Sequence, residues 1–445
     1  MKTESAPFAP ELVDQVRWLR EFFPYLHAHR GRTFVIHVPG ELIATSAFEL
    51  LASDFALLAG LGVRLVLVHG IRAQIDQRLN QLAISPRLVN NLRITDDAAL
   101  ACVIDAAGSV RASIEARLSV SLSATPETRA RMRVVSGNFV TARPVGVRGG
   151  IDFGFTGEVR RIDRQRLQVL LKHDNLVLIS PLGYSPNGAI FNLQAEHLAA
   201  AIATELAAEK LIFLTEQAIQ DPVTLARLSE VTTDEALAWA AGQSLTPAFR
   251  QALSAAIDAC QHGVERAHLV PCAAQGGLLV ELFSRKGFGT LISQTPFEQL
   301  RPASIDDVHG ILQLIQPLEA QGLLAPRSRE WLEIRIPDYI VLDLDGLIIG
   351  TAALHHTETD ACALIASMAV HPEYRRHGRA GRLLGYLENK ARRHGVRELF
   401  VLSTQTMDWF SERGYHSVTL HDLPDSLRDL YRPERNAKIL CKTLH

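Results

Sequence analysis

The chain has 445 residues, more than one hydrophobic core usually serves, so two or more domains are expected. Hydrophobic residues make up 47% and charged residues 21% of the chain, an ordinary globular composition. The formal net charge of −2 gives no electrostatic footprint for nucleic acid or an anionic membrane, so small molecules and other subunits are the expected partners.

The first part of the chain alternates strands and helices. An apolar strand at 33–38 is followed by a helix at 46–61, which begins at a serine suited to an N-cap. Residues 63–68 form a second, nearly continuous apolar strand, a pattern typical of strands buried on both faces of a parallel sheet. Another helix is expected near residue 74. This alternation predicts a doubly wound α/β domain with helices on both faces of its sheet.

The same order returns further along, with strands at 175–180 and 210–215 around a helix at 195–208. Between the two parts, residues 132–140 and the glycine-rich stretch 146–157 are expected to form antiparallel hairpins. The segment Ser293-Gln294-Thr295-Pro296 has the composition of a linker. We therefore expect a first domain over 1–292, a linker over 293–298 and a second domain over 299–445.

The second domain has a different order of elements. A helix from about 304 to 316 should be ended by Pro317, and a hairpin is expected across Asp345-Gly346, a strong turn signal. A strand at 362–370, a helix at 378–394, a strand at 398–403 and two last strands near 415–420 and 438–443 follow. The second domain is therefore expected to be a compact unit built differently from the first.

The five cysteines are scattered without a C-x-x-C pair, which argues against a disulfide framework or a zinc site and fits a reducing compartment. Residues 1–10 have no apolar run and do not resemble a signal peptide. The longest apolar stretch, 55–68, is interrupted and too short to span a bilayer. We expect a cytoplasmic protein without a bound metal.

The most informative segment lies at a strand-to-helix junction and reads Arg375-Arg376-His377-Gly378-Arg379-Ala380. The start of a helix offers unpaired N–H groups and the positive end of its dipole, so it binds phosphate readily. Gly378 and Ala380 are small enough for a pyrophosphate to approach the backbone, and the arginines add positive charge.

This segment closely resembles the signature R/Q-x-x-G-x-G/A of the GNAT acetyltransferase superfamily. The preceding strand, the amphipathic helix after it, the strand at 399–403 and the run from Trp409 to Tyr415 agree with that superfamily. The resemblance implies a mixed sheet for this domain, and acetyl-CoA as co-substrate with no permanently bound cofactor. It also implies that N–H groups of Met368, Ala369 and Val370 hold the thioester carbonyl, and that the strand at 399–403 splays away to make room.

The whole chain resembles bacterial N-acetylglutamate synthases, which join an amino-acid-kinase-like domain to a GNAT domain. The matching runs are 29–36, 65–70, 134–139, 208–212, 263–269, 317–322, 327–330 and 409–414. The resemblance implies acetyl transfer to the α-amine of L-glutamate, the first step towards L-arginine. It further implies that Arg327 and Arg435, with Ser367, bind the substrate carboxylates, and that Ser403 protonates the leaving thiolate; a turn-capping role for Ser403 is as common.

One position departs from the family. The resemblance implies a glutamate base seven residues before His371, but Leu364 stands there and cannot accept a proton. Four nearby groups are candidates to replace the base through a water molecule, namely His355, His356, Glu358 and Asp360. Loss of the proton to bulk water, or an acceptor other than glutamate, are the alternatives.

The first domain lacks the phosphate-binding residues of amino-acid kinases. The first strand ends in His37-Val38-Pro39-Gly40 and the second in His69-Gly70-Ile71-Arg72, so a lysine and two glycines are missing. We expect no kinase activity. The resemblance instead implies that this domain binds L-arginine as a feedback inhibitor, and that the chain forms a homo-oligomer, a hexamer by analogy. The implied arginine-binding residues are Tyr25, Lys210, His268, Glu281 and Gly287.

Two rival functions remain open at this point. One is an acetylglutamate kinase with an appended domain, against which the lost phosphate-binding residues argue. The other is an arginine-sensing protein with a weakened acetyltransferase, which Leu364 keeps open and the intact loop at 375–380 argues against.

Overall fold

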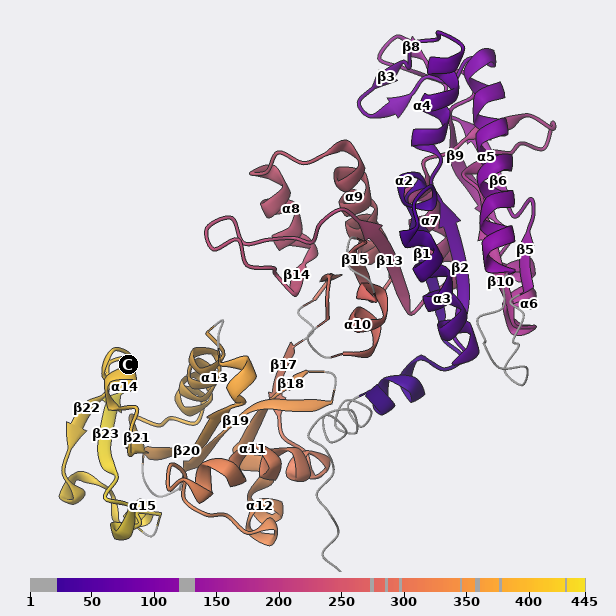
Figure 1. The fold of residues 1–445 in the computed structure, drawn as a ribbon. Coiled ribbons are helices and arrows are strands. Elements are labelled where there is room, and N and C mark those ends of the chain that lie inside the picture. The colour runs from indigo at the N-terminus through magenta and orange to yellow at the C-terminus, as the bar shows by residue number, and fades with distance from the viewer. Residues whose placement is uncertain are drawn as a thin grey trace, which may run out of the picture. The chain divides into compact units, whose positions relative to one another are not determined.

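A computed structural model describes residues 22–119, 133–272, 276–284, 287–295, 298–344, 346–356, 361–375, 378–428 and 430–444. The chain divides into two compact units, 1–295 and 296–445. Both units are mixed α/β structures, which confirms the predicted fold class (Figure 1). Among the described residues, no helix has the length and apolar character needed to cross a membrane.

Unit 1 is built on an eight-stranded sheet in the order β14-β16-β15-β13-β1-β2-β10-β5. All neighbouring pairs are parallel except β15 with β16. The central strands are nearly continuous apolar runs, as expected for strands covered on both faces. The strands are β1 (Thr33–Val38), β2 (Arg64–His69), β5 (Arg133–Ser136), β10 (Asn175–Ile179), β13 (Lys210–Thr215), β14 (Glu230–Thr232), β15 (Ala267–Pro271) and β16 (Thr290–Ser293).

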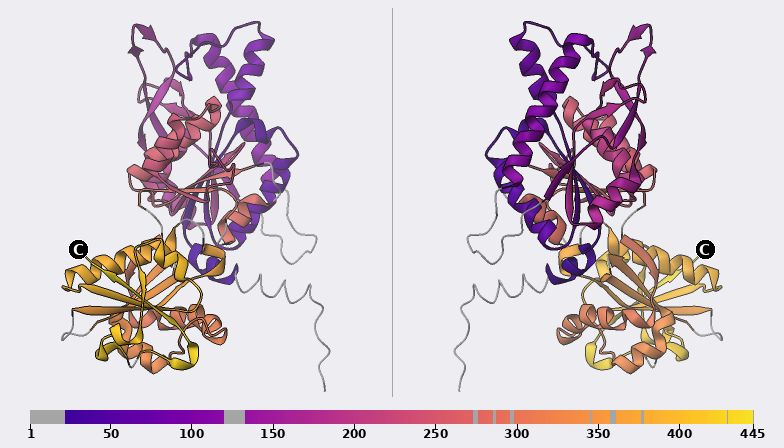
Figure 2. Two further views of the ribbon diagram at one scale, coloured as in Figure 1. Left: turned by 90° about the vertical axis from the view of Figure 1, so that its left-hand side faces the viewer. Right: turned by 90° about the vertical axis from the view of Figure 1, so that its right-hand side faces the viewer.

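Helices cover both faces of this sheet, as the two side views show (Figure 2). One face packs against α6 (Arg164–Lys172), α7 (Ala195–Leu206), α8 (Thr233–Ala241) and α9 (Pro247–Gln261). The other packs against α3 (Ala47–Gly60), α4 (Arg72–Gln81), α5 (Asp97–Leu118) and α10 (Gly277–Phe283), with the short α2 (Gly40–Ile43) and a helix over 22–29 nearby. The doubly wound prediction for this part of the chain is confirmed.

Smaller strands lie at one end of unit 1. A four-stranded sheet holds β12 (Ile190–Asn192), β11 (Leu182–Tyr184), β6 (Val140–Pro144) and β9 (Gly157–Ile162), and two hairpins are formed by β3 (Leu88–Val89) with β4 (Leu92–Arg93) and by β7 (Val147–Arg148) with β8 (Ile151–Asp152). The hairpin predicted at 146–157 is therefore present. The one predicted at 132–140 is wrong, because β5 pairs in parallel with β10 at the edge of the large sheet.

Unit 2 has a seven-stranded sheet in the order β17-β18-β19-β20-β21-β23-β22, in which only β20 and β21 pair in parallel among the described residues. The hairpin predicted across residues 345–346 joins β18 to β19. The strands are β17 (Glu298–Pro302), β18 (Tyr339–Leu344), β19 (Leu347–His356), β20 (Cys362–Val370), β21 (Glu398–Ser403), β22 (His416–Val418) and β23 (Lys438–Thr443).

The two faces of this second sheet carry different helices (Figure 2). One face holds α13 (Arg379–Arg393) and α14 (Met407–Ser411); the other holds α11 (Val308–Ala320), α12 (Arg329–Arg335) and α15 (Asp425–Arg428). The prediction that Pro317 ends its helix is wrong, because α11 continues through it to Ala320. Burial of Val308, Ile311 and Ile315 offsets the hydrogen bond that the proline cannot donate.

Candidate active site and effector site

The centre of the unit 2 sheet opens where β20 and β21 part. The two strands pair from Cys362 opposite Glu398 to Ile365 opposite Val401, which is the last pair among the described residues. Beyond it, β21 pairs only with β23 and β20 only with β19. The predicted splay is present, and it leaves one side of residues 366–370 without a neighbouring strand.

Backbone donors line this gap. His371 donates its N–H to the Ile349 carbonyl on the β19 side at 2.8 Å, so the N–H of Val370, one residue earlier, points into the gap. A bulge in the β19–β20 pairing lies beside Ser367, whose φ of +49° is left-handed. The bulge turns the strand at this point and re-aims the side chain of Ser367.

The loop after β20 leads directly into α13. Arg375 Nε donates to the carbonyl of Val370 at 3.4 Å, which holds the loop against the end of the strand. Gly378 is the N-cap of α13 with a φ of +71°, and the first turn of this 15-residue helix contains no acidic residue. The helix start therefore keeps its positive potential. Arg376 and His377, also predicted for this loop, lie outside the described residues.

Arg379, predicted to bind the same ligand, is held by protein groups. Its Nε lies 2.5 Å from Glu298 Oε2, and its Nη1 donates to the Tyr374 carbonyl at 3.2 Å. Arg382 binds the other oxygen of the buried Glu298 at 2.7 Å. Arg379 thus ties the loop to β17, and the half-buried Ala380 packs beside it against the core.

A cluster of polar and aromatic side chains lies on the α11/α12 face of the sheet. The guanidinium of Arg327 stacks on Trp331, with Cζ 4.1 Å from the ring centroid, and its Nε is buried without a partner in the described part of the chain. Burial, together with the charges of Arg432 and Arg435, lowers the pKa of Arg327. Two further cationic side chains therefore act on Arg327 here, which favours an anionic ligand beside it.

The predicted carboxylate binders are thus brought together. Arg435 is anchored through Nη2 to the Leu323 carbonyl at 2.6 Å, so its remaining donors are oriented. Ser367 Oγ lies 3.0 Å from the hydroxyl of Tyr339, which is fully buried and whose pKa burial raises. The positive charge of Arg327 acts against this rise in the pKa of Tyr339.

His355 and Asp338 form a buried pair in the same cluster. His355 Nδ1 lies 2.8 Å from Asp338 Oδ2, and Nε2 has no partner among the described residues. Burial opposes ionisation of Asp338, but the hydrogen bond and charge of His355 hold its pKa below the usual value. The His355 ring packs edge-on against Trp331 with centroids 5.3 Å apart. Donation from Nδ1 to the carboxylate leaves Nε2 as the proton acceptor.

Leu364 lies directly opposite His355 in the β19–β20 register. Its side chain is buried and packs with Phe400, Ile439 and Cys441 on the same face of the sheet. Ser403 ends β21 beside the gap; its Oγ accepts the N–H of Thr406 at 3.0 Å and lies 2.9 Å from the Thr406 hydroxyl. Ser403 therefore caps a turn and keeps a hydroxyl proton that it can donate.

The residues predicted to bind an effector converge in unit 1. Glu281 Oε1 lies 2.5 Å from His268 Nδ1, and Oε2 accepts the N–H groups of Phe288 and Gly289 at 2.6 and 2.7 Å. Although burial opposes it, these donors lower the pKa of Glu281 to about 2. The carboxylate is ionised and positioned, and Oε1 keeps a lone pair for a cationic ligand.

The other three predicted effector residues surround this pair. Lys210 is buried, and its charge lowers the pKa of His268 after the larger effect of burial. Gly287, with a φ of +56°, runs so close to Glu281 that an added Cβ would lie 2.6 Å from Oε2. Tyr25, on the helix over 22–29, faces His29 with ring centroids 6.1 Å apart, and His29 reaches the Leu282 carbonyl next to Glu281.

Comparison with known proteins agrees with both units. Residues 32–271 match the amino acid kinase family, and residues 307–421 match the acetyltransferase (GNAT) family. The chain is 47% identical to the amino-acid acetyltransferase of Pseudomonas syringae pv. syringae, over 97% of this chain and 100% of that protein. It is 46% identical to the amino-acid acetyltransferase of Pseudomonas aeruginosa strain LESB58, with the same coverage.

The chain belongs to the amino-acid acetyltransferase family. Its fold is also that of N-acetylglutamate synthase from Neisseria gonorrhoeae in complex with coenzyme A and L-arginine, with a TM-score of 0.88 and 38% identity over 97% of this chain and 99% of that one. The complex of that synthase with coenzyme A and N-acetyl-glutamate gives a TM-score of 0.62 at the same identity and coverage.

Four residues of this acetyltransferase's sites were missed from the sequence. Asp338, Tyr339 and Trp331 support His355, Ser367 and Arg327, and Glu298 holds Arg379. An aspartate directly before a buried strand was the one available signal for Asp338. The others depend on contacts between segments far apart in the chain.

Proposed function

We propose that this enzyme transfers the acetyl group of acetyl-CoA to the α-amine of L-glutamate, giving N-acetyl-L-glutamate and CoA. This is the first step of L-arginine biosynthesis, and L-arginine is proposed as its feedback inhibitor. The observation that carries the proposal is the splayed gap between β20 and β21, which lies beside the cationic cluster around Arg327. The Neisseria synthase complexes with coenzyme A, N-acetyl-glutamate and L-arginine support it.

Acetyl-CoA occupies the gap in this proposal. Its pantetheine arm lies along residues 366–370 in place of a neighbouring strand, and the Val370 N–H binds the thioester carbonyl oxygen as it becomes negative. Met368 and Ala369 contact the pantetheine arm along this stretch. The pyrophosphate binds the N–H groups that follow Gly378, with Arg375 beside them.

The acceptor amino acid binds on the face of the sheet that carries α11 and α12. Arg327 and Arg435 bind the two carboxylates of glutamate, and the Ser367 hydroxyl, fixed by Tyr339, adds a hydrogen bond. The stacking of Arg327 on Trp331 holds the guanidinium in one orientation. A monocarboxylic amino acid would leave part of this cationic cluster unpaired, which favours glutamate.

His355 is the proposed base. The glutamate ammonium transfers one proton to His355 Nε2, directly or through water, and the free amine attacks the thioester carbon. As the C–S bond breaks, the CoA thiolate takes the proton of the Ser403 hydroxyl. The attacking nitrogen loses its second proton to the Ser403 oxygen through water, which restores the hydroxyl and leaves the neutral amide. Asp338 stabilises the imidazolium that forms and orients the ring. His356 faces the other side of the sheet, where its ring packs on His394, and Glu358 and Asp360 lie outside the described residues.

L-arginine binding is assigned to unit 1. The ligand's guanidinium binds Glu281, while Lys210 and the backbone at Gly287 bind its carboxylate, with Tyr25 covering the site. Inhibition requires that arginine bind two states of the enzyme with different affinity. We propose a cytoplasmic homo-oligomer, a hexamer by analogy, as the assembly that switches.

Gly378 tests the acetyl-CoA site. An alanine there must adopt a φ of +71°, which costs about 1–2 kcal/mol, so Gly378→Ala is expected to raise the KM for acetyl-CoA roughly tenfold. Gly385→Ala is the matched control, since it also has open space around Cβ but lies inside α13 without a positive φ. Equal KM values for the two variants in a thiol-release assay would refute the assignment.

The acceptor is tested by CoA release with each amino acid, with and without L-arginine. L-glutamate is expected to give the highest kcat/KM, and Arg327→Gln is expected to raise its KM by about 10- to 100-fold, the worth of a charge-assisted hydrogen bond. The control is Arg329→Gln, two residues after Arg327, which removes an exposed ion pair with Glu333. Absence of turnover with every amino acid would favour the arginine-sensing protein instead.

A further inference from the structure

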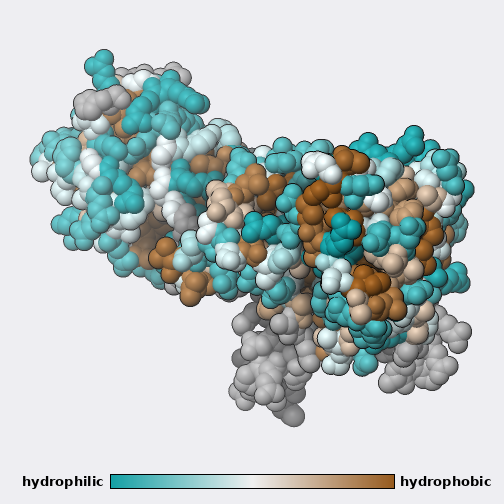
Figure 3. Space-filling view, turned by 90° about the horizontal axis from the view of Figure 1, so that it is seen from above, coloured by the Kyte–Doolittle hydropathy of each residue, from teal (hydrophilic) through white to brown (hydrophobic). Residues whose placement is uncertain are grey.

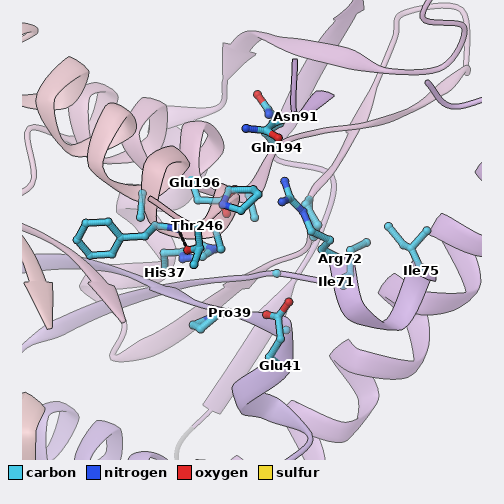
Figure 4. A pocket seen from close by; sticks show the side chains of 18 of the residues that line it. His37, Pro39, Glu41, Ile71, Arg72, Ile75, Asn91, Gln194, Glu196 and Thr246 are labelled. Carbon is cyan, nitrogen blue, oxygen red and sulfur yellow. Dashed lines mark hydrogen bonds between the residues drawn. The ribbon is translucent and has the colours of Figure 1, made fainter. Parts of the chain in front are cut away.

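A cavity of about 540 Å³ lies within unit 1, at the carboxyl ends of β1 and β2. The N-terminal ends of α4, α7 and α9 converge on it through Arg72, Glu196 and Pro247. Figure 4 shows the side chains of Arg72, Glu41 and Gln194 directed into the space from different elements. The cavity is separate from the effector cluster around Glu281, which does not line it.

Two buried side chains that line this cavity have polar atoms without a hydrogen-bond partner in the described part of the chain. His37 is 3% exposed, and neither of its ring nitrogens is hydrogen-bonded among the described residues. Arg93 is 7% exposed; one end of its guanidinium binds Asp76 at 2.5 Å, and Nη1 is left without an acceptor in the same described part. Buried donors and acceptors of this kind cost free energy unless a ligand or water satisfies them.

The cavity does not suit a phosphate. The turns after β1 and β2 are in close contact: a Cβ added to Gly70 would lie 2.9 Å from the backbone nitrogen of Gly40. The Gly70 N–H already donates to the Val38 carbonyl, and Gln74 occupies the Gly40 carbonyl at 2.7 Å. The carboxylates of Glu41, Glu196 and Glu216 also line the space and would repel a polyanion.

The charges are instead divided into two poles. The acidic pole consists of Glu41, Glu196 and Glu216 around His37, and the charges of Glu196 and Glu41 act directly on the His37 ring. Burial outweighs them and lowers the pKa of His37, so the ring is neutral and offers one donor and one acceptor. The basic pole consists of Arg72 and Arg93, with Asn91, Asn192 and Gln194 beside them.

We propose that this cavity binds a small zwitterion, an amino acid whose ammonium group meets the acidic pole and whose carboxylate meets Arg72 and Arg93. The apolar residues between the poles, among them Ile71, Leu193 and Phe249, contact its aliphatic part. Arg72 is already oriented by Gln251 Oε1 at 2.5 Å. The site is a second ligand site of the kinase-like unit, and it does not depend on the proposed acetyl transfer or arginine site.

Part of the wall of the cavity reaches the surface at the exposed Leu88. Figure 3 looks onto the end of unit 1 that carries α4, β3 and β8, where hydrophobic residues lie among hydrophilic ones. Leu82, Leu88 and Val147 are exposed at this end, and Leu88 also lines the cavity. The volume matches sites for small organic ligands, which lie between about 300 and 1,000 Å³.

The test measures thermal unfolding and calorimetric titration of the full chain with L-leucine, L-lysine and 6-aminohexanoate. At tenfold excess over Kd, at least one of these zwitterions is expected to raise the Tm by about 3 °C. Hexylamine and hexanoate, which each match one half of 6-aminohexanoate, are expected to bind at least tenfold more weakly than it does. Glu196→Gln and Arg72→Gln are expected to abolish the shift, and Glu281→Gln to leave it unchanged.

Arg72 and Glu196 are only half-buried, so their variants should fold. Glu41→Gln, at an exposed residue, is a further variant that tests the acidic pole. The inference fails if no zwitterion in the series stabilises the protein, or if hexylamine binds as well as 6-aminohexanoate. It also fails if Mg-ATP raises the Tm and the rise is lost in Arg72→Gln, since the site would then be nucleotide-binding. L-arginine binding that is lost in Glu196→Gln but kept in Glu281→Gln would support this site and contradict the proposed effector site.

Discussion

Replacing His355 by glutamine is expected to lower kcat by roughly 10²- to 10³-fold, the usual contribution of a positioned general base. The amide cannot accept the ammonium proton at the position of Nε2, while the KM for acetyl-CoA should hardly change, because His355 lies on the acceptor side of β20. Steady-state kinetics with L-glutamate measure both constants.

Two further variants separate catalysis from packing. Leu364→Glu in the His355→Gln background puts a carboxylate directly opposite position 355 and is expected to restore part of the lost rate. Asp338→Asn removes the negative charge that holds the Nδ1–H tautomer and stabilises the imidazolium, so it should lower kcat, but less than His355→Gln does. His356→Gln, on the other face of the strand, is the matched control. An unchanged kcat in His355→Gln would exclude His355 as the base.

The loop from 375 to 380 could be read from the sequence because its chemistry is local. A glycine at the N-cap, a helix without acidic residues in its first turn and a preceding apolar strand lie next to one another in the chain. The alternation of strands and helices in unit 1 is equally local, since burial on both faces demands continuous apolar runs. These features were therefore predictable with the correct order.

The partners of the site residues were not predictable in the same way. The place of Arg379 beside Gly378 predicts an acetyl-CoA contact, but its ion pair with Glu298, from a strand 81 residues earlier, could not be predicted from the sequence. His355 was one of four candidate bases, and only the pairing with Asp338 across the sheet distinguishes it. Pro317 reads as a helix end because propensity opposes it, but packing of α11 on β19 outweighs that preference.

Replacing Glu281 by glutamine is expected to abolish inhibition by L-arginine, with a rise in the inhibitory concentration of at least roughly 100-fold, since a charge-assisted pair with the guanidinium is lost. Catalysis without arginine should be unaffected, because Glu281 belongs to unit 1 and the reacting groups belong to unit 2. The control is Glu265→Gln, which replaces an exposed carboxylate in the loop before β15. Retention of normal arginine inhibition in Glu281→Gln would place the effector elsewhere.

The same carboxylate makes stability depend on pH in a direction that its contacts determine. The pKa of Glu281 falls from 4.5 to about 2 on folding, so the ionised form stabilises the native state fully above pH 4.5. That contribution, about 3 kcal/mol, is lost as the pH falls from 4.5 towards 2. Urea unfolding of wild type and Glu281→Gln should therefore differ most near neutral pH and converge in acid. A difference that is independent of pH would mean that shape, rather than the charge held by Phe288, Gly289 and His268, makes Glu281 important.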